Sequence, residues 1–255
     1  MSGTRRARAG LFVTATDTDV GKTAVACALA SWYAGRGVDV GVMKPVATGA
    51  GRPAVSDDAK RLARASGARD ARRLVNPVCF REPLAPLTAA RRAGRTIRLS
   101  GVLAAYAALA RRHDVMVVEG IGGLLVPLTS RACVADLAAR LGLPLVIVAR
   151  TGLGTLNHTL LTVAEARRRR LPVLGLVFTE AARPRPADRI SRRTNPGLIA
   201  EATGLPIIGC LPYHPPPPGQ AAWQTWCAWA ARRLDGRILE RAHRNWGKGR
   251  AWEFP

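Results

Sequence analysis

Short apolar runs, each the length of one β-strand, alternate with longer helix-forming stretches along most of this chain. Strands are predicted at residues 11–14, 38–43, 114–119, 143–149, 173–178 and 206–211. Continuous apolar strands separated by helices are typical of a parallel sheet that helices cover on both faces. We therefore expect an α/β fold of three layers, with a mostly parallel central sheet, in a single domain of residues 1–214.

Helices are predicted between these strands, at residues 22–35, 57–65, 101–112, 134–141, 156–169 and 196–204. The run Pro215–Pro218 ends the compact pattern, so residues 215–255 are expected to form a Pro-rich link, a helix and a tail. The helix, at 221–234, carries Trp at helical spacing, and this stripe predicts a packing surface. Residues 236–255 are basic and without periodicity, which favours a loose tail.

The charge balance is strongly basic, with 39 Lys and Arg against 17 Asp and Glu and a formal net charge of +22. Such a balance usually suggests a nucleic-acid partner. However, 35 of these cations are Arg scattered through the chain, as in a compositional bias, so no specific nucleic acid is expected. Only 4 are Lys, and Lys22 and Lys44 lie in the motifs described below, where Arg cannot replace a compact point charge.

No membrane contact is expected either, because the longest apolar run, 143–149, is far shorter than the roughly 20 residues that span a bilayer. The basic N-terminal residues are followed by acids and lack a small-residue cleavage site, so a signal peptide is not expected. The 5 cysteines include no C-x-x-C pair, which argues against a disulfide framework or a zinc site. A cytoplasmic location is therefore expected.

A predicted strand, the segment Ala15–Thr23 and a predicted helix follow one another in the order that a phosphate-binding loop requires. Backbone N–H groups at the helix start can hold phosphates, Lys22 can reach the β- and γ-phosphates, and the Thr23 hydroxyl can bind Mg²⁺. The strict spacing is not met, because Thr16 stands where the motif requires Gly and the loop is one residue longer. The Gly-Lys-Thr triplet between strand and helix still indicates a nucleotide site and a P-loop NTPase-like fold.

The segment Phe12-Val-Thr-Ala-Thr-Asp-Thr-Asp-Val-Gly-Lys-Thr23 resembles the opening of the dethiobiotin synthase family, in which the lengthened loop is typical. Further blocks resemble that family in the same order, over residues 11–213: Lys44-Pro-Val-Ala-Thr-Gly49, Asn76-Pro77, Glu82-Pro83, Glu119-Gly-Ile-Gly-Gly123, Gly154–Thr162 and Gly209–Pro212. The lengthened loop and the block at Lys44 together are a specific signature. The resemblance implies an ATP-dependent cyclo-ligase that forms carbon–nitrogen bonds.

The implied reaction starts from 7,8-diaminononanoate, with CO₂ or bicarbonate and ATP as co-substrates. One amine takes up CO₂ as a carbamate, ATP phosphorylates the carbamate, and the second amine closes a cyclic urea. Such a protein positions its reactants and neutralises their oxyanions. The resemblance implies that Lys44, at the carboxyl end of a strand, contacts the carbamate, while Lys22 neutralises the phosphates.

Magnesium is expected beside the triphosphate, held by oxygen ligands. Glu119 ends an apolar strand, where an unpaired carboxylate is costly, and the resemblance implies that Glu119 and Thr23 bind the metal. A further carboxylate is expected from Asp57 or Asp58. Asp58 is preferred because the residues after it match the helix start of the family, and Asp57 is then interpreted as a helix N-cap.

The resemblance extends the nucleotide site to thirteen positions: Asp19, Val20, Gly21, Lys22, Thr23, Ala24, Asp58, Glu119, Gly120, Gly122, Thr179, Leu211 and Pro212. Substrate contacts are expected from Thr18, Thr48, Gly122 and Gly123. The glycines in the block after Glu119 would allow a ligand to approach the backbone closely.

The family often has Asn, to read the purine, where this chain has Thr179, so a base contact is expected from Thr179 or from the backbone at 211–213. Leu87 likewise replaces a frequent His. The family is usually a homodimer that holds the substrate carboxylate across the interface, and Asn157 and His158 are candidates for this contact or for a helix cap.

Two other functions compete with this hypothesis. A cobyrinate diamide synthase would need a glutaminase domain, for which residues 216–255 are too few. A ParA/MinD-like ATPase would use its charge on DNA or a membrane. Such ATPases carry a further Lys near the start of the loop, where this chain has the acidic stretch Ala15–Asp19, so the ligase is the principal hypothesis.

Overall fold

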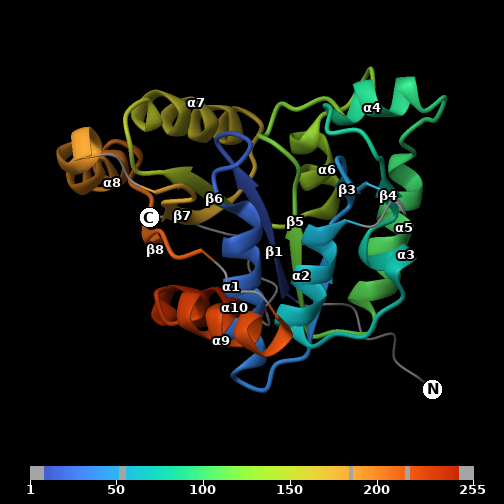
Figure 1. The fold of residues 1–255 in the computed structure, drawn as a ribbon, viewed down its shortest axis with the longest axis horizontal. Helices are drawn as coiled ribbons and strands as arrows, with labels where there is room; N and C mark the ends of the chain where they lie inside the picture. The colour runs from blue at the N-terminus through green and yellow to red at the C-terminus, as the bar shows by residue number, and fades with distance from the viewer. Residues whose placement is uncertain (1–8, 52–55, 184–185, 216–218, 247–255) are drawn as a thin grey trace.

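The computed structural model describes residues 9–51, 56–183, 186–215 and 219–246. Its centre is a six-stranded sheet in the order β2-β5-β1-β6-β7-β8, and every neighbouring pair is parallel (Figure 1). The strands are β1 (Ala9–Ala15), β2 (Val40–Met43), β5 (Val115–Glu119), β6 (Leu145–Arg150), β7 (Val173–Thr179) and β8 (Ile207–Leu211). All six strands predicted from the sequence are confirmed. Two further strands, β3 (Val46–Ala47) and β4 (Val78–Cys79), form a small parallel sheet that the sequence did not indicate.

The helices follow the predicted pattern with two corrections. They are α1 (Lys22–Ala34), α2 (Asp57–Ser66), α3 (Arg72–Val75), α4 (Pro86–Arg92), α5 (Leu99–Ala110), α6 (Val134–Leu141), α7 (Thr155–Arg168), the 3₁₀ turn η1 (Pro186–Asp188), α8 (Arg189–Thr203), α9 (Gln220–Ala231) and α10 (Gly236–Trp246). The predicted start of α8 at Pro196 is wrong, because Pro196 lies buried inside the helix. The loose tail expected from residue 236 is wrong as far as residue 246, because these residues form α10.

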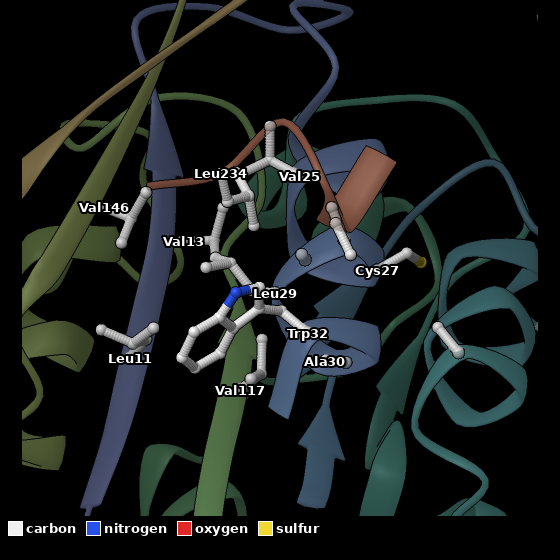
Figure 2. Close-up of a cluster of buried hydrophobic side chains, with 14 of the residues drawn as sticks. Leu11, Val13, Val25, Cys27, Leu29, Ala30, Trp32, Val117, Val146 and Leu234 are labelled. Carbon is white, nitrogen blue, oxygen red and sulfur yellow. The ribbon is translucent and has the colours of Figure 1, made fainter. Parts of the chain in front are cut away.

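Alternate side chains of the strands enter two different cores, one on each face of the sheet. Leu11 and Val13 of β1 pack in one core with side chains of α1, α2, α9 and α10, whereas Phe12 lies in the other with side chains of α4 to α8. Figure 2 shows the first core, where Leu29 and Trp32 of α1 lie over β1 and its neighbours. Apolar layers on both faces confirm the three-layer α/β architecture.

The Trp-rich helix α9 belongs to the first core. Trp223 and Trp226 are buried, and their rings stack with centroids 5.1 Å apart. Because α9 packs against α1 and α2, the Trp stripe is a packing surface, as predicted. Residues 216–218 of the predicted link and residues 247–255 of the predicted tail lie outside the described residues.

The described part of the chain holds no helix that is both long and apolar enough to cross a membrane. All five cysteines lie within it, and each is a free thiol.

Candidate active site

Neighbouring strands of the sheet bring the candidate residues to one edge. Glu119 ends β5, Lys44 directly follows β2, and Thr179 ends β7. Since the strands are parallel and β1 lies at the centre of the order, these residues flank the loop that follows β1. The carboxyl edge of a parallel sheet is where α/β proteins bind ligands.

The loop after β1 turns sharply into α1. Gly21 is the N-cap residue in the left-handed region at φ 89°, and Asp19 is also left-handed at φ 56°. The Lys22 side chain is buried and its Nζ donates to the Asp17 carbonyl at 2.8 Å, so the ammonium lies under the curve of the loop. Burial, and then the nearby charge of Lys44, lower the pKa of Lys22 to about 8.

A cluster of opposite charges lies beside this loop. Lys44 Nζ lies 2.5 Å from Glu119 Oε1 and 2.9 Å from Asp58 Oδ2, and it donates to the Gly120 carbonyl at 3.1 Å. The Thr23 hydroxyl donates to the same Glu119 oxygen at 2.8 Å. The structure therefore brings together Thr23, Lys44, Asp58 and Glu119, four of the residues singled out from the sequence.

Burial and the opposite charges act against each other on these groups. Burial raises the pKa of the Glu119 carboxyl, although the Lys44 ammonium opposes the shift. Burial alone would lower the pKa of Lys44, but Glu119 and Asp58 together raise it, so the ammonium stays charged. At Asp58 burial is outweighed by Lys44 and Thr23, and the pKa falls below its ordinary value.

The chemistry of this cluster fits Mg²⁺. Glu119 Oε2 is buried and has no hydrogen-bond partner within the described ranges, so a strong acceptor is left unsatisfied beside the loop. Carboxylate and hydroxyl oxygens from Glu119, Asp58 and Thr23 are the hard donors that Mg²⁺ takes, with phosphate oxygens and water completing its shell.

The two adjacent aspartates of α2 have different surroundings. Asp58 faces Lys44, whereas the side chain of Asp57 is 76% exposed and pairs with Lys60 at 2.9 Å. The predicted N-cap role of Asp57 is wrong, because Ser56 is the N-cap residue and its side chain accepts from the Ala59 amide. The geometry therefore favours Asp58 as the candidate ligand.

The sequence analysis gave no role to Asn76, although it lies in one of the family blocks. Asn76 Nδ2 donates to the carbonyls of Lys44, at 2.7 Å, and Val78, at 3.1 Å. The Lys44 amide also donates to the Val75 carbonyl at 2.7 Å. The backbone of Lys44 is thus held on both sides, which leaves its side chain as the part that can reorient.

Thr179 lies behind the phosphate loop. Its hydroxyl donates to the Val20 carbonyl, and a Cβ on Gly21 would come within 3.1 Å of the Thr179 oxygen. The carbonyl of Leu211, in turn, accepts from the Glu180 amide at 2.9 Å. Thr179 thus braces the loop, and its expected contact with a base stays a prediction.

The glycines after Glu119 make close approaches within the protein itself. A Cβ on Gly120 would lie 3.0 Å from the Phe12 ring, and one on Gly123 would lie 3.3 Å from the Ala15 carbonyl. Gly122 is left-handed at φ 59°. Small residues here let the segment after β5 run directly against the start of the phosphate loop.

A pocket of about 510 Å³ opens beside this contact. Its lining includes Asp17 and Thr18 of the loop, Gly123, and His158 and Leu161 of α7. The other predicted contacts lie around the phosphate loop and the strand ends: Asp19, Val20 and Ala24 in or after the loop, Thr48 after β3, and Pro212 after β8. Asn157 lies exposed in the first turn of α7.

Two solved structures match this architecture over nearly their whole length. A ParA family ATPase from Chlorobium tepidum TLS matches with a TM-score of 0.50 and 14% identity, over 93% of this chain and 98% of that chain. The MinC:MinD cell division complex of Aquifex aeolicus matches with a TM-score of 0.50 and 11% identity, over 97% of this chain and 98% of that chain. These identities show the fold alone, so the ParA/MinD-like alternative is a distant structural relation.

Curated relatives are much closer in sequence. The ATP-dependent dethiobiotin synthetase of Anaeromyxobacter dehalogenans (strain 2CP-C) is 50% identical over 208 residues, which cover 81% of this chain and 91% of that protein. That of Bacillus cereus (strain B4264) is 41% identical over 204 residues, 80% of this chain and 83% of that protein. A family model described as an AAA domain matches residues 9–217. On the strength of these matches, the chain belongs to the dethiobiotin synthetase family.

Proposed function

We propose that this chain is an ATP-dependent dethiobiotin synthase, a cyclo-ligase of biotin biosynthesis that converts 7,8-diaminononanoate, CO₂ and ATP into dethiobiotin, ADP and phosphate. The observation that carries the proposal is the convergence of Lys22, Lys44 and Glu119 beside a phosphate loop. This loop lies in a chain that is 50% identical to a dethiobiotin synthetase over 81% of its length. The ParA/MinD-like alternative has no comparable support in sequence.

The phosphate loop holds the triphosphate. Backbone N–H groups at the start of α1 would donate to the phosphates, and Lys22 supplies a compact positive charge from beneath the loop. Thr179 keeps the loop in place through its bond to the Val20 carbonyl. These contacts fix the γ-phosphate for in-line transfer, which requires positioning and charge stabilisation rather than a covalent nucleophile.

Lys44 acts on the second reactant. Its ammonium contacts the carbamate and transferring phosphoryl oxygens and stabilises their negative charge, while a carbamate oxygen bonds to the γ-phosphorus and the bond to the leaving ADP oxygen breaks. Asn76 fixes the backbone from which the side chain extends. Loss of Lys44 would therefore reduce turnover more strongly than nucleotide binding.

Mg²⁺ would be held by Thr23, Asp58 and Glu119. When bound, the metal supplies positive charge to the β- and γ-phosphate oxygens. The unsatisfied Oε2 atom of Glu119 is the feature of this chain that supports the assignment. Asp58, half exposed on the first turn of α2, would complete the pair of carboxylates.

The diamine would occupy the pocket of about 510 Å³ beside the loop. Thr18 and Asp17 offer polar groups suited to its amines, and Leu161 offers apolar surface for its aliphatic chain. Thr48, Gly122 and Gly123 remain candidates for further substrate contacts.

We also propose a homodimer that acts in the cytoplasm. Leu160 and Leu161 of α7 are 37% and 62% exposed, Leu161 lines the pocket, and Leu153 just before the helix is 70% exposed. Large exposed apolar side chains on one helix are typical of an interface. The five free thiols fit a reducing compartment.

Product formation tests the proposal directly. Purified protein would be given Mg-ATP, bicarbonate and 7,8-diaminononanoate, with each omitted in turn, and dethiobiotin would be measured by mass spectrometry beside phosphate release. Dethiobiotin should form only when all are present. Lys44→Gln should lose most turnover and keep ADP binding, while Lys60→Gln, on the exposed Asp57 pair, should match the wild type. Phosphate release that is indifferent to the diamine would contradict the proposal.

A further inference from the structure

The ammonium of Lys44 lies where the proposed metal ligands meet. It contacts one oxygen each of Glu119, Asp58 and Gly120, and Thr23 donates to the same Glu119 oxygen. The Lys44 side chain is almost completely buried, and so is that of Glu119, whereas the Asp58 side chain is 38% exposed. The single positive charge of Lys44 thus pairs with both carboxylates that Mg²⁺ would need and leaves one negative charge uncompensated among the three groups.

Mg²⁺ and this ammonium cannot both use Glu119 Oε1 and Asp58 Oδ2, and Glu119 Oε2, which has no hydrogen-bond partner in the described part of the chain, gives the metal a first contact beside them. Mg²⁺ requires direct contacts of about 2.0–2.1 Å in near-octahedral geometry. An ammonium that stays 2.5 Å from Glu119 Oε1 and 2.9 Å from Asp58 Oδ2 would lie within contact distance of the metal. Two cations so close in a buried site repel each other strongly, because screening by water is weak there.

We propose that Lys44 is a resident cation of the metal site, so that Mg²⁺ displaces its ammonium from Asp58 and Glu119 and thereby frees it to reach the substrate. The destination of the freed ammonium rests on the proposed function, whereas the exchange itself rests on the contacts described above. Lys44 is in this sense both the catalytic cation and the group that keeps the carboxylates paired before nucleotide and metal arrive.

The surroundings of Lys44 suit such an exchange. Its main chain is held by Asn76 and by the Val75 carbonyl, so the release involves only rotations of the side chain. The Gly120 carbonyl also accepts from the ammonium, and this oxygen is not one of the proposed metal ligands. Asp58, with its side chain 38% exposed, can turn from Lys44 toward an incoming ion without unfolding of α2.

The small number of lysines makes the exchange visible by NMR. The chain has only 4 lysines, at 22, 44, 60 and 248, so labelled lysine gives few side-chain signals. The protein would carry ¹³Cε/¹⁵Nζ-lysine, with signals assigned from Lys44→Arg and Lys60→Arg, and would be titrated with MgCl₂ alone, then with MgCl₂ and ADP. We expect the Lys44 signal to shift in step with metal binding measured by calorimetry, while Lys60 does not respond beyond a matched NaCl titration. Metal binding with a fixed Lys44 signal would overturn the proposal.

A second measurement uses metal affinity and needs no assignment. Lys44→Met removes the competing cation, so Mn²⁺ followed by electron paramagnetic resonance should bind about tenfold tighter or better than to the wild type. Lys60→Met removes a charge of the same kind from the neighbouring exposed pair and should leave the affinity unchanged. Mn²⁺ binding to Lys44→Met that is no tighter than wild type would overturn the proposal.

Thermal melts in EDTA and in Mg²⁺ test whether Lys44→Met is folded and how much the metal stabilises it. We expect a larger stabilisation by Mg²⁺ in this variant than in the wild type, and an equal or smaller one would count against the exchange. None of these readouts involves the diamine. A fixed Lys44 in a protein that forms dethiobiotin would overturn the exchange alone, and an exchanging Lys44 in a protein that forms none would overturn the proposed function alone.

Discussion

In the absence of metal, the contact between Lys44 and Glu119 should contribute a coupling free energy of several kcal/mol to the stability of the fold. Both side chains are buried, and their charged atoms lie 2.5 Å apart. Glu119→Gln would keep the shape and leave Lys44 with Asp58, which is partly exposed. Removing one partner of a buried pair costs about 3–5 kcal/mol, because the other charge stays desolvated.

A double-mutant cycle measures this coupling. Glu119→Gln, Lys44→Met and the double variant would be unfolded with urea in EDTA, with Trp fluorescence as the signal. Each single variant should lower the free energy of unfolding by about 3 kcal/mol, and the double variant should lose about 2–4 kcal/mol less than the sum. The residual cost of the double variant would come from Asp58, which loses Lys44, and from Thr23, whose acceptor Glu119 is replaced.

The exposed pair of Lys60 and Asp57 provides the matched control on the same helix. Their atoms lie 2.9 Å apart, but both side chains face solvent, so the same cycle there should give at most about 1 kcal/mol. Additive effects of the Lys44 and Glu119 variants, within about 0.5 kcal/mol, would refute the reasoning, because charges that interact at this depth cannot act independently.

Three further results are expected. Folding lowers the pKa of Lys22 from 10.5 to about 8, so between these pH values the unfolded state binds more protons than the folded state. The contribution of Lys22 to the free energy of unfolding should therefore rise with pH in this range. ADP affinity should fall above pH 8, because the folded protein loses the Lys22 charge there. Calorimetry in buffers of different ionisation enthalpy should show proton uptake on ADP binding, absent in Lys22→Met. His113, which bonds Asp39 and the buried Asp70 at 2.8 Å each, should cost about 2 kcal/mol in urea unfolding when changed to Ala. Leu161→Arg should convert a dimer to monomers in sedimentation, and a wild-type monomer would contradict the proposed interface.

The sequence predicted the central sheet because each of its strands is a continuous apolar run, and the helix α1 because Gly-Lys-Thr and an apolar stripe mark its start. It did not predict β3 and β4, since strands of two residues leave no periodic signal. The start of α8 was missed because Pro is common at the first position of a helix, and residues 189–195 are polar except for the exposed Ile190.

The helix α10 was missed although a signal existed. Ile238, Leu239 and Ala242 follow helical spacing, but they stand among many arginines that suggested a solvated tail. Leu239 and Ala242 are buried in the core formed with α1. Composition therefore concealed a pattern that the tertiary contacts of α1 make stable.

The candidate site was predictable wherever a residue type was unusual for its place. Lys44 and Glu119 are charged residues at the ends of apolar strands, and the structure joins them although they are 75 positions apart. Only the spatial neighbours of Asp57 and Asp58 show which of them faces the site, since adjacent residues on a helix point in different directions. Asn76 was not predictable from its sequence because its role is to hold a main-chain carbonyl, which no side-chain pattern reveals.

The charged side chains of the candidate site are of both signs, whereas the whole chain has a formal net charge of +22. Lys22 and Lys44 lie near Asp58 and Glu119, so the candidate site carries two positive and two negative side chains. Arg92 and Arg168, which belong to the Arg excess, have side chains 61% and 68% exposed that already pair with Glu82 and Glu165, so they add no unpaired charge to this site. We therefore expect a cation that arrives with the nucleotide to bind the carboxylates that Lys44 holds.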